Sequence, residues 1–374
     1  MTKCSYSAKC NACSEWETPY SLQKDTKIAN FKHLLTKKHL NFLGQIDFIS
    51  AGEHSLRHKA DFIYQHKNGL SEFGFYTKNR ELLDIQKCLQ MCPELGKAFD
   101  AFRSVDIKTN TSFIKKGSVR LRVSPNNEYG CWLDFSNIDI KNLLDDGNYF
   151  KQLLNKKFKI EVGQKKKQVV LEPDGSLKLK NLKPSVWFQT YSEQGHAIPI
   201  KCHISSFTQP SWITGQKLIE CIKPWLKNNS GQTLVEFGAG VGFFTSYFLS
   251  AEKSVIALEV EESANECLNE NRPDTSYESK LKVITGDFHR TEFTTDEKIN
   301  IAFVNPARAG LKSFCNNLLK LKTEKIIYVS CFPESMVSDL DVLSKHYKIK
   351  QISIVDQFPQ TQHYEACVLL EKLS

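Results

Sequence analysis

Two side chains with chemistry of their own, a thiol and a carboxylate, stand at the ends of apolar runs near the C-terminus. Residues 325–331 form a β-branched, apolar run that ends at Cys331 and predicts a buried parallel strand. Residues 365–370 form a second such run, which begins at Glu365. A thiolate is a nucleophile and a carboxylate can remove a proton, so the pair predicts covalent catalysis assisted by a base. The alternative for Cys331 is a small apolar thiol that only fills space at a strand end.

The link between the last two predicted strands determines whether these groups meet. Residues 356–364 separate the strand at 352–355 from the strand that starts at Glu365. A parallel return needs about a dozen residues or more, so this short link predicts an antiparallel pair. The last strand then starts at the sheet edge where the parallel strands end, which is where open α/β sheets bind ligands. We therefore expect Glu365 beside Cys331 and beside Asn305, which follows another apolar strand.

A glycine-rich turn indicates which ligand binds at this edge. The strand at 233–237 runs into Gly238 and Gly240, and glycines there let the backbone approach a ligand closely. The next strand ends at Glu259, whose carboxylate can bind both ribose hydroxyls of a nucleoside, and Asp287 ends a third strand on the adenine side. No glycine loop carries Gly-Lys-Ser/Thr, so the pattern favours S-adenosylmethionine over ATP. From the glycine turn alone, a dinucleotide oxidoreductase is the alternative.

A thiolate, a base and an electrophilic methyl donor suit the methylation of a pyrimidine carbon. Carbon 5 of uracil is a poor nucleophile, but addition of a thiolate to carbon 6 turns it into an enolate carbon. This carbon can attack a sulfonium methyl group, after which a base must remove the carbon-5 proton to eject the sulfur. In this chemistry Cys331 would add to the ring and Glu365 would take the proton.

Three cysteines crowd the start of the chain. Cys4, Cys10 and Cys13 have the spacing C-x5-C-x2-C, in which short loops let several sulfurs converge on one metal centre. A fourth ligand is then required, and Cys92, which precedes a proline, is the first candidate, with Cys88 in reserve. The spacing alone does not separate an iron–sulfur cluster from structural zinc, and ordinary thiols are the third interpretation.

Composition and element pattern bound the class of protein. The chain has 374 residues, 41% hydrophobic and 25% charged, which predicts a soluble globular protein of at least two domains. No apolar run approaches the roughly 18 residues that span a bilayer, and the first residues lack a secretory pattern. We therefore expect a cytoplasmic protein that is not bound to membranes, and a monomer. The net charge of +8 is compatible with a polyanionic partner.

The pattern of elements changes near residue 196. Residues 1–195 predict short alternating strands of an α+β module, in which Arg57, His58 and Lys59 precede a strand with aromatic side chains. Such a set can grip a phosphate backbone and stack bases, and a solvated strand edge is the alternative. Residues 196–374 alternate strands with helices, which is typical of a doubly wound parallel α/β sheet.

Taken together, these motifs resemble those of the RNA uracil-C5 methyltransferases. The residues that carry the resemblance extend over nearly the whole chain: Cys4, Cys10, Cys13 and Cys92-Pro93; Leu56-Arg57-His58-Lys59-Ala60; Phe207-Thr208-Gln209; the glycine turn; Glu259; Asn305-Pro306; Ser330-Cys331; and Phe358-Pro359 with His363-Tyr364-Glu365. The chain is most similar to the members that act on 23S ribosomal RNA and begin directly with the cluster cysteines, without the small β-barrel module that many relatives carry.

The resemblance implies a class I, Rossmann-like methyltransferase domain dependent on S-adenosylmethionine, preceded by an iron–sulfur and RNA-binding domain. It implies that Cys331 is the nucleophile and Glu365 the proton acceptor. The residues that it places around S-adenosylmethionine are Gln209, Gly238, Glu259 and Asn305. It also implies a [4Fe-4S] cluster with a structural role in the first domain, and RNA, above all ribosomal RNA, as the partner.

The chain departs from the family pattern beside the catalytic residues. Ala307 and Ala309 stand where the family has proline and arginine, Phe332 stands where it has asparagine, and Thr208 stands where it has phenylalanine. The nucleophile and the base are retained, so we expect activity, with altered contacts to the target nucleotide or its neighbours. The alternatives are the same chemistry on a transfer RNA uridine, and a non-catalytic iron–sulfur protein that binds RNA.

Overall fold

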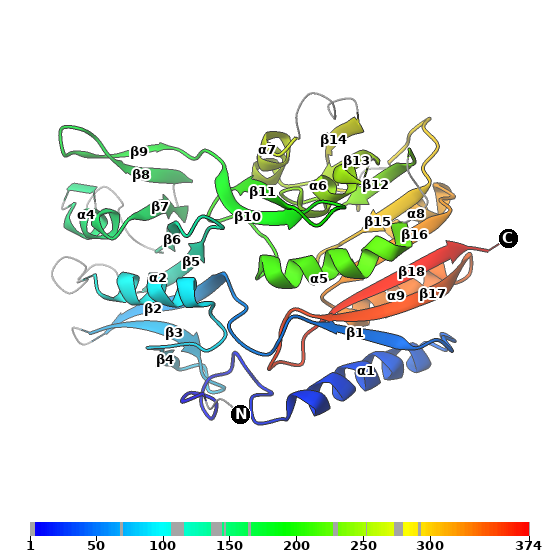
Figure 1. Ribbon diagram of the computed structural model, residues 1–374, viewed down its shortest axis with the longest axis horizontal. Helices are drawn as coiled ribbons and strands as arrows, with labels where there is room; N and C mark the ends of the chain where they lie inside the picture. Colours follow the sequence, from blue (N-terminus) through cyan, green and yellow to red (C-terminus); the bar gives the residue numbers. More distant parts are fainter. Residues whose placement is uncertain are drawn as a thin grey trace. The chain divides into compact units, whose positions relative to one another are not determined.

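In the computed structural model the chain forms two compact units (Figure 1). The first unit comprises Met1–Glu17, Glu53–Phe188 and Cys202–Ser206, and the second comprises Thr18–Gly52, Gln189–Lys201 and Phe207–Ser374. The structure describes residues 4–67, 70–105, 116–135, 144–145, 147–163, 166–226, 231–251, 253–272, 280–290 and 293–373.

The second unit is built on an eight-stranded sheet with the strand order β1-β17-β18-β16-β15-β12-β13-β14. Its strands are β1 (Ile46–Ser50), β12 (Thr233–Phe237), β13 (Ser254–Glu259), β14 (Leu281–Thr285), β15 (Ile301–Val304), β16 (Lys325–Ser330), β17 (Tyr347–Asp356) and β18 (Glu365–Lys372). Neighbouring strands are parallel except at β18, which runs antiparallel to both β16 and β17. The expected α/β sheet and the antiparallel return at its C-terminal end are both confirmed.

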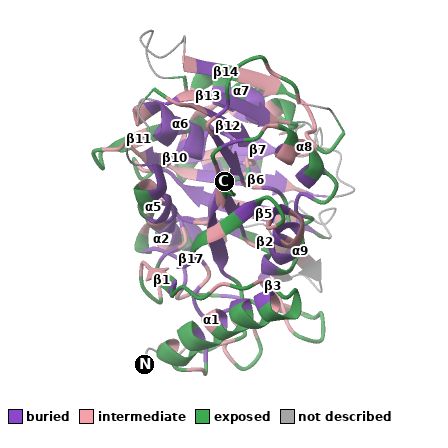
Figure 2. Ribbon diagram, turned by 90° about the vertical axis from the view of Figure 1, so that its right-hand side faces the viewer, coloured by how far each residue is buried: buried purple, intermediate pink, exposed green. Residues whose placement is uncertain are grey.

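Apolar runs that are buried on both faces explain why these segments are strands. Every residue of β15, which reads Ile-Ala-Phe-Val, is buried, as expected for a central parallel strand that is covered on two sides. In Figure 2, which colours residues by burial, α1 is mostly exposed, whereas β12 and α6 are largely buried. Full burial of one large aliphatic or aromatic side chain contributes roughly 1.5–3 kcal/mol, so each such side chain in these strands stabilises the unit.

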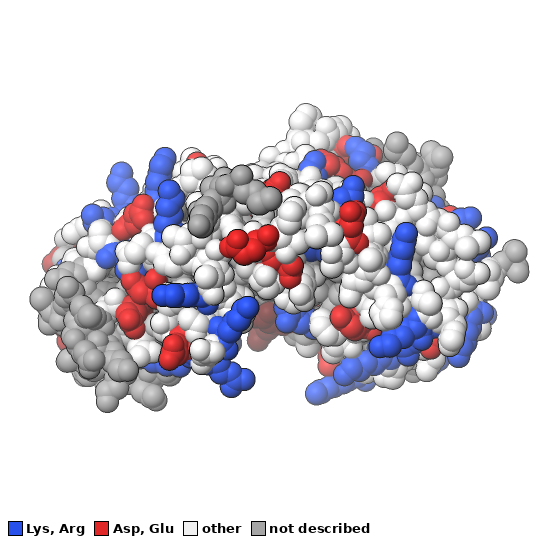
Figure 3. Space-filling model, turned by 90° about the horizontal axis from the view of Figure 1, so that it is seen from below, with Lys and Arg blue, Asp and Glu red and all other residues white. Residues whose placement is uncertain are grey.

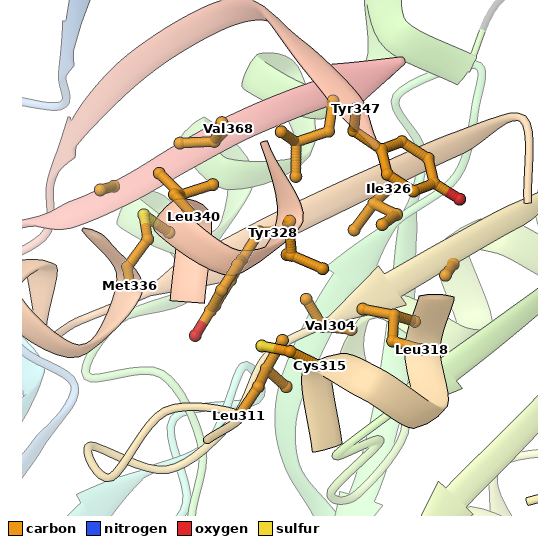
Figure 4. Close-up of a cluster of buried hydrophobic side chains, with 14 of the residues drawn as sticks. Val304, Leu311, Cys315, Leu318, Ile326, Tyr328, Met336, Leu340, Tyr347 and Val368 are labelled. Carbon is orange, nitrogen blue, oxygen red and sulfur yellow. The ribbon is translucent and has the colours of Figure 1, made fainter. Parts of the chain in front are cut away.

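Helices cover both faces of this sheet. On one face, α1 (Tyr20–Lys37), α8 (Phe314–Lys320) and α9 (Pro333–Leu343) contribute to a single apolar cluster with the strands. Figure 4 shows part of that cluster, in which Met336 and Leu340 lie near Tyr328 and Val368. On the other face, α6 (Phe243–Ser250) packs the ring of Phe244 4.6 Å from that of Phe303. The second unit also contains α5 (Trp212–Ile222), the 3-10 helix η2 (Lys223–Leu226) and α7 (Glu262–Glu270).

The first unit is built on a second eight-stranded sheet, with the order β4-β3-β2-β5-β6-β7-β8-β9. Its strands are β2 (Lys59–Lys67), β3 (Leu70–Tyr76), β4 (Leu82–Asp84), β5 (Lys116–Val123), β6 (Tyr129–Asp134), β7 (Phe158–Val162), β8 (Lys167–Leu171) and β9 (Leu177–Asn181). Its pairs are antiparallel except β6 with β7, and the helices α2 (Pro93–Arg103) and α4 (Asn148–Asn155) accompany it. This is the expected α+β arrangement. A two-stranded sheet of β10 (Ser185–Tyr191) and β11 (Ala197–Cys202) follows.

The division between the units differs from the single boundary near residue 196 that the sequence predicts. Thr18–Gly52 belongs to the second unit. The physical reason is strand pairing, because β1 lies parallel to β17 with Ile46 opposite Ile352, and Phe31 of α1 is fully buried in the apolar cluster. None of the described helices combines the length and the apolar character needed to cross a bilayer.

Candidate active site

The register of the two central C-terminal strands brings Cys331 and Glu365 together. Ser330 of β16 lies opposite Ala366 of β18, so the residue after the first and the residue before the second occupy adjacent positions at the sheet edge. Electrostatics agree with this geometry, because burial and then the nearby Glu365 carboxylate raise the pKa of the Cys331 thiol. The prediction that the antiparallel return places these two side chains in one site is therefore consistent with the structure.

Burial changes the protonation behaviour of Glu365. Its side chain is almost inaccessible, and burial raises its pKa from an ordinary 4.5 to about 8. A general base works best when its pKa lies close to the working pH, because it is then available as the free base without being too weak to take the proton. The Glu365 carboxylate adds to the cost of ionising Cys331, whereas the pKa of Glu365 itself is raised by burial.

Arg308 is a third member of the site, and its role was not predicted from the sequence. Its guanidinium interacts with the Cys331 thiol through charge and a hydrogen bond, and both effects lower the pKa of the thiol against the dominant effect of burial. A cation beside a cysteine favours the thiolate, which is the reactive form. The only signal in the sequence was its place in the loop that follows Asn305.

The turn after β16 holds Cys331 at the start of a helix. Ser330 Oγ accepts a hydrogen bond from the Phe332 backbone N–H at 3.1 Å, and Ser335 Oγ donates to the Phe332 carbonyl at 3.0 Å. Pro333 starts α9, where a proline costs no backbone hydrogen bond. The chain therefore turns sharply at Cys331, which stays partly exposed, and presents the Phe332 ring at 37% exposure beside it.

The glycine turn and Asn305 meet at the same sheet edge. Gly238 has φ +81°, and a Cβ added there would lie 2.7 Å from the Asn305 carbonyl oxygen, so both the backbone conformation and the space require glycine. The backbone N–H of Gly240 donates to Glu259 Oε2 at 2.8 Å. Glu259 Oε1 accepts from the N–H groups of Val260 and Glu261, each at 2.9 Å. A carboxylate accepts about four hydrogen bonds, so Glu259 retains capacity for a ligand hydroxyl.

Glu236 adds an unsatisfied acceptor below this turn. Its carboxylate is completely buried, and Oε2 accepts a hydrogen bond from Thr245 Oγ1 at 2.6 Å, whereas Oε1 has no hydrogen-bond partner among the described residues. Burial, opposed by the Thr245 bond and assisted by Glu259, raises its pKa to about 8. A buried acceptor without a partner is costly and indicates a missing donor. The acceptor oxygens around the turn therefore fit a polar nucleoside such as that of S-adenosylmethionine, whose hydroxyl groups can donate.

The two remaining residues expected around S-adenosylmethionine are Asp287 and Gln209. The Gly286 N–H donates to the Glu259 carbonyl at 3.0 Å. Asp287, the next residue, therefore follows a direct backbone contact with Glu259. Asp287 accepts a hydrogen bond from the His289 N–H at 2.9 Å. Gln209 is buried, and its Oε1 accepts from Gln357 Nε2 at 2.9 Å, so it lies against the link that precedes Glu365.

In the first unit, the thiols of Cys4, Cys10, Cys13 and Cys88 influence one another. Burial, followed by Cys88, raises the pKa of Cys13 to about 12, with smaller contributions from Cys10 and Cys4. A hydrogen bond also joins the N-terminal loop to the segment that contains Cys88. The hydroxyl of Tyr6 accepts it from the Gln86 backbone N–H at 2.9 Å.

Cys92 is engaged elsewhere. Its buried sulfur accepts a hydrogen bond from the Leu95 N–H at 3.4 Å and caps α2. An N–H donor to the sulfur does not prevent metal binding, so the choice between Cys92 and Cys88 as fourth ligand stays a prediction. Within the described part of the chain, no three His, Cys, Asp or Glu side chains converge closely enough to hold a metal ion. The side chains as they lie do not form a completed cluster or zinc site.

Two of the three basic residues Arg57, His58 and Lys59 are less available to a phosphate backbone than the sequence suggests. His58 is buried, and burial lowers its pKa to about 4, so it is neutral at pH 7. Burial, with the adjacent cations of Arg122 and Arg120, also lowers the pKa of Lys59. His58 therefore does not act as an exposed cation for a phosphate backbone.

Comparison with known proteins agrees with this arrangement. Residues 178–373 match the family described as tRNA (Uracil-5-)-methyltransferase. The chain is 35% identical to an RNA methyltransferase of Bdellovibrio bacteriovorus, over 99% of the chain and 95% of that protein. It is 25% identical to a 23S rRNA (uracil(1939)-C(5))-methyltransferase of Mannheimia succiniciproducens, over 100% of the chain and 82% of the relative. It is 27% identical to a tRNA/tmRNA (uracil-C(5))-methyltransferase of Aliarcobacter butzleri, over 99% of both.

Among solved structures, the tRNA (uracil-54, C5)-methyltransferase of Pyrococcus abyssi, crystallised with S-adenosyl-L-homocysteine, has the same fold. Its TM-score is 0.71 at 19% identity, over 96% of this chain and 86% of that one.

Proposed function

The chain belongs to the RNA uracil-C5 methyltransferase family and is an S-adenosylmethionine-dependent enzyme, and from this we infer that it methylates carbon 5 of a uridine through a covalent bond to Cys331. The observation that carries the mechanism is the adjacency of Cys331 and Glu365 at the ends of β16 and β18, with Arg308 beside the thiol. When bound, S-adenosylmethionine supplies an electrophilic methyl group.

The residues of the site account for each bond that forms and breaks. The Cys331 thiolate, favoured by Arg308, forms a bond to carbon 6 of uracil, and the electrons of the 5,6 double bond move to carbon 5. Carbon 5 takes the methyl group, so it then carries both the methyl group and its original proton. Glu365, as the carboxylate, removes that proton, the double bond re-forms and the bond to Cys331 breaks, which returns the thiolate. No oxidant or reductant is required.

We propose 23S ribosomal RNA as the substrate, because relatives named for that RNA align with the whole chain. Transfer RNA is the second candidate, since a relative named for tRNA and tmRNA also aligns over 99% of the chain. The test uses purified protein, methyl-labelled S-adenosylmethionine, and ribosomal and transfer RNA from cells that lack the gene. We expect one 5-methyluridine position in 23S ribosomal RNA. Label in transfer RNA alone would transfer the proposal to that substrate, and no label in any RNA would favour a non-catalytic RNA-binding protein.

For the first unit we propose an iron–sulfur cluster on Cys4, Cys10, Cys13 and Cys88. The support is the C-x5-C-x2-C spacing and the mutual influence of these four thiols, and ligation would require the side chains to move closer than they lie here.

The two candidate fourth ligands form a matched pair for testing this. Prepared without oxygen, the wild-type protein and Cys92→Ser should contain iron and sulfide at about four each per chain, whereas Cys88→Ser should lose most of both. Metal and sulfide analysis together with the visible absorption spectrum provide the measurement. Stoichiometric zinc in the wild type would refute the cluster, and loss in Cys92→Ser alone would restore that residue as the ligand.

A further inference from the structure

The link from Asp356 to Tyr364, which leads into Glu365, is attached at several points to the N-terminal helix α1. Lys27 Nζ lies 2.8 Å from Asp356 Oδ1, and both side chains are buried, at 3% and 0% exposure. The same Nζ donates to the Phe358 carbonyl at 3.3 Å. The Tyr20 hydroxyl donates to the other Asp356 oxygen at 2.7 Å. One helix thus holds the point at which the chain leaves β17.

Two further contacts hold the middle and the end of the link. Gln23 Nε2 donates to Gln360 Oε1 at 2.8 Å, and Gln23 Oε1 accepts from the Gln360 backbone N–H at 3.0 Å. The hydroxyl of Tyr364, the residue directly before Glu365, donates to Asn30 Oδ1 at 2.8 Å. The attachment therefore extends to the residue next to the base.

The residues of α1 that make these contacts share one face of the helix. Tyr20, Gln23, Lys27 and Asn30 follow one another at spacings of three and four, which place side chains on one stripe. The other lysines of the helix are ordinary surface residues; Lys24 and Lys32 are exposed, and Figure 3 shows the Lys and Arg side chains on the face seen from below. Of Lys24, Lys27 and Lys32, only Lys27 is buried. A buried charge is costly unless it is paired, and such a pair fixes one register of the elements that it joins.

We propose that α1 is a positioning element for the proton acceptor, with Lys27 as its principal positioning residue. The inference depends on the proposed function, because it assigns Glu365 the removal of the carbon-5 proton. Strand pairing fixes both ends of the link, with Val355 opposite Glu365, and α1 fixes the part between. Without Lys27, the Asp356 carboxylate would remain buried without its cation, and the link would relax. The step that depends on Glu365 would then slow, whereas addition of Cys331 would not.

The test separates these two steps in the full-length protein. RNA containing 5-fluorouridine in place of uridine, with S-adenosylmethionine, traps the adduct to Cys331 because no carbon-5 proton can be removed. Lys27→Met should form this adduct as the wild type does. With ordinary RNA, the same variant should accumulate a denaturation-resistant protein–RNA adduct and release product about tenfold more slowly or worse, since small displacements of a reacting group have effects of this size. The KM for S-adenosylmethionine should not change.

Controls on the same helix keep the result decisive. Lys32→Met changes an exposed lysine of α1 and should release product at the wild-type rate. Gln23→Ala removes neutral contacts, two to Gln360 and one to the Thr18 carbonyl, and leaves the Lys27–Asp356 pair in place, so it should slow release in the same direction by a smaller factor. If Lys27→Met releases product normally, or if it fails to fold and Gln23→Ala leaves release unchanged, the inference is wrong. If the wild type itself forms no 5-fluorouridine adduct, the proposed function fails instead.

Discussion

Cys331→Ala should abolish methyl transfer while leaving the fold intact. Removal of a covalent nucleophile lowers turnover by a factor on the order of 10⁴ or more, because the remaining groups cannot provide an equivalent pathway. Cys331 is partly exposed at the end of β16, so loss of its sulfur leaves no large cavity in the sheet. Transfer of labelled methyl groups to RNA measures the activity, and a denaturing gel with 5-fluorouridine RNA measures the covalent adduct. Both should disappear.

A second cysteine supplies the matched control. Cys315 of α8 is buried in the apolar cluster, where its sulfur lies 4.0 Å from the Asp339 carbonyl. Cys315→Ala should lower the free energy of unfolding by about 1 kcal/mol, as for removal of one small buried group, and should retain adduct formation. If Cys331→Ala still formed the adduct and Cys315→Ala did not, the assignment of Cys331 as the nucleophile would be wrong.

The part of the fold that follows local rules was predictable from the sequence. The runs that end at Val304 and Ser330 are short and mostly apolar, so their burial on both faces followed directly from their composition. The short link before Glu365 left no room for a crossover helix, which determined the direction of β18. Because these strand ends and the glycine turn share one edge, the candidate site could be assembled before the structure was known.

The parts that depend on non-local pairing were not predictable. Nothing in the sequence of β1 indicates that it pairs with β17, and Lys27 reads as one more surface lysine of a polar helix. The two candidate fourth cysteines differ only in what lies around them, since Cys92 caps α2 and Cys88 faces the N-terminal loop. The sequence likewise predicts His58 in an exposed basic site for RNA, whereas the folded chain buries it. In each case a partner distant in sequence decides the environment.

Glu365→Gln should separate addition from proton removal more completely than any change in α1. Glutamine keeps the size of the side chain but is not a base, so Cys331 should still add to uracil and the methylated adduct should persist. Loss of a general base slows its step by about 10²–10⁴-fold. The rate at which the adduct disappears, followed on denaturing gels after a single turnover, is the measurement. Glu371→Gln, on the same strand but paired with Lys350 at its outer end, should behave as the wild type.

The pH dependence of that rate tests the role of burial at Glu365. Proton removal needs the carboxylate, and burial raises the pKa of Glu365 to about 8, so the wild-type rate should rise about tenfold per pH unit below pH 8 and level off above it. In Glu365→Gln this rise should be absent.

The stability of the fold should change with pH in the opposite sense. Because the folded state holds the Glu365 proton more tightly than the unfolded state, the free energy of unfolding should fall as pH rises from about 4.5 to about 8. A glutamine at this position removes that contribution, so a variant that is inactive and yet more stable at pH 8 than the wild type would show that the fold carries a cost to keep this base buried. A variant with unchanged pH profiles for both release and unfolding would remove Glu365 from the mechanism.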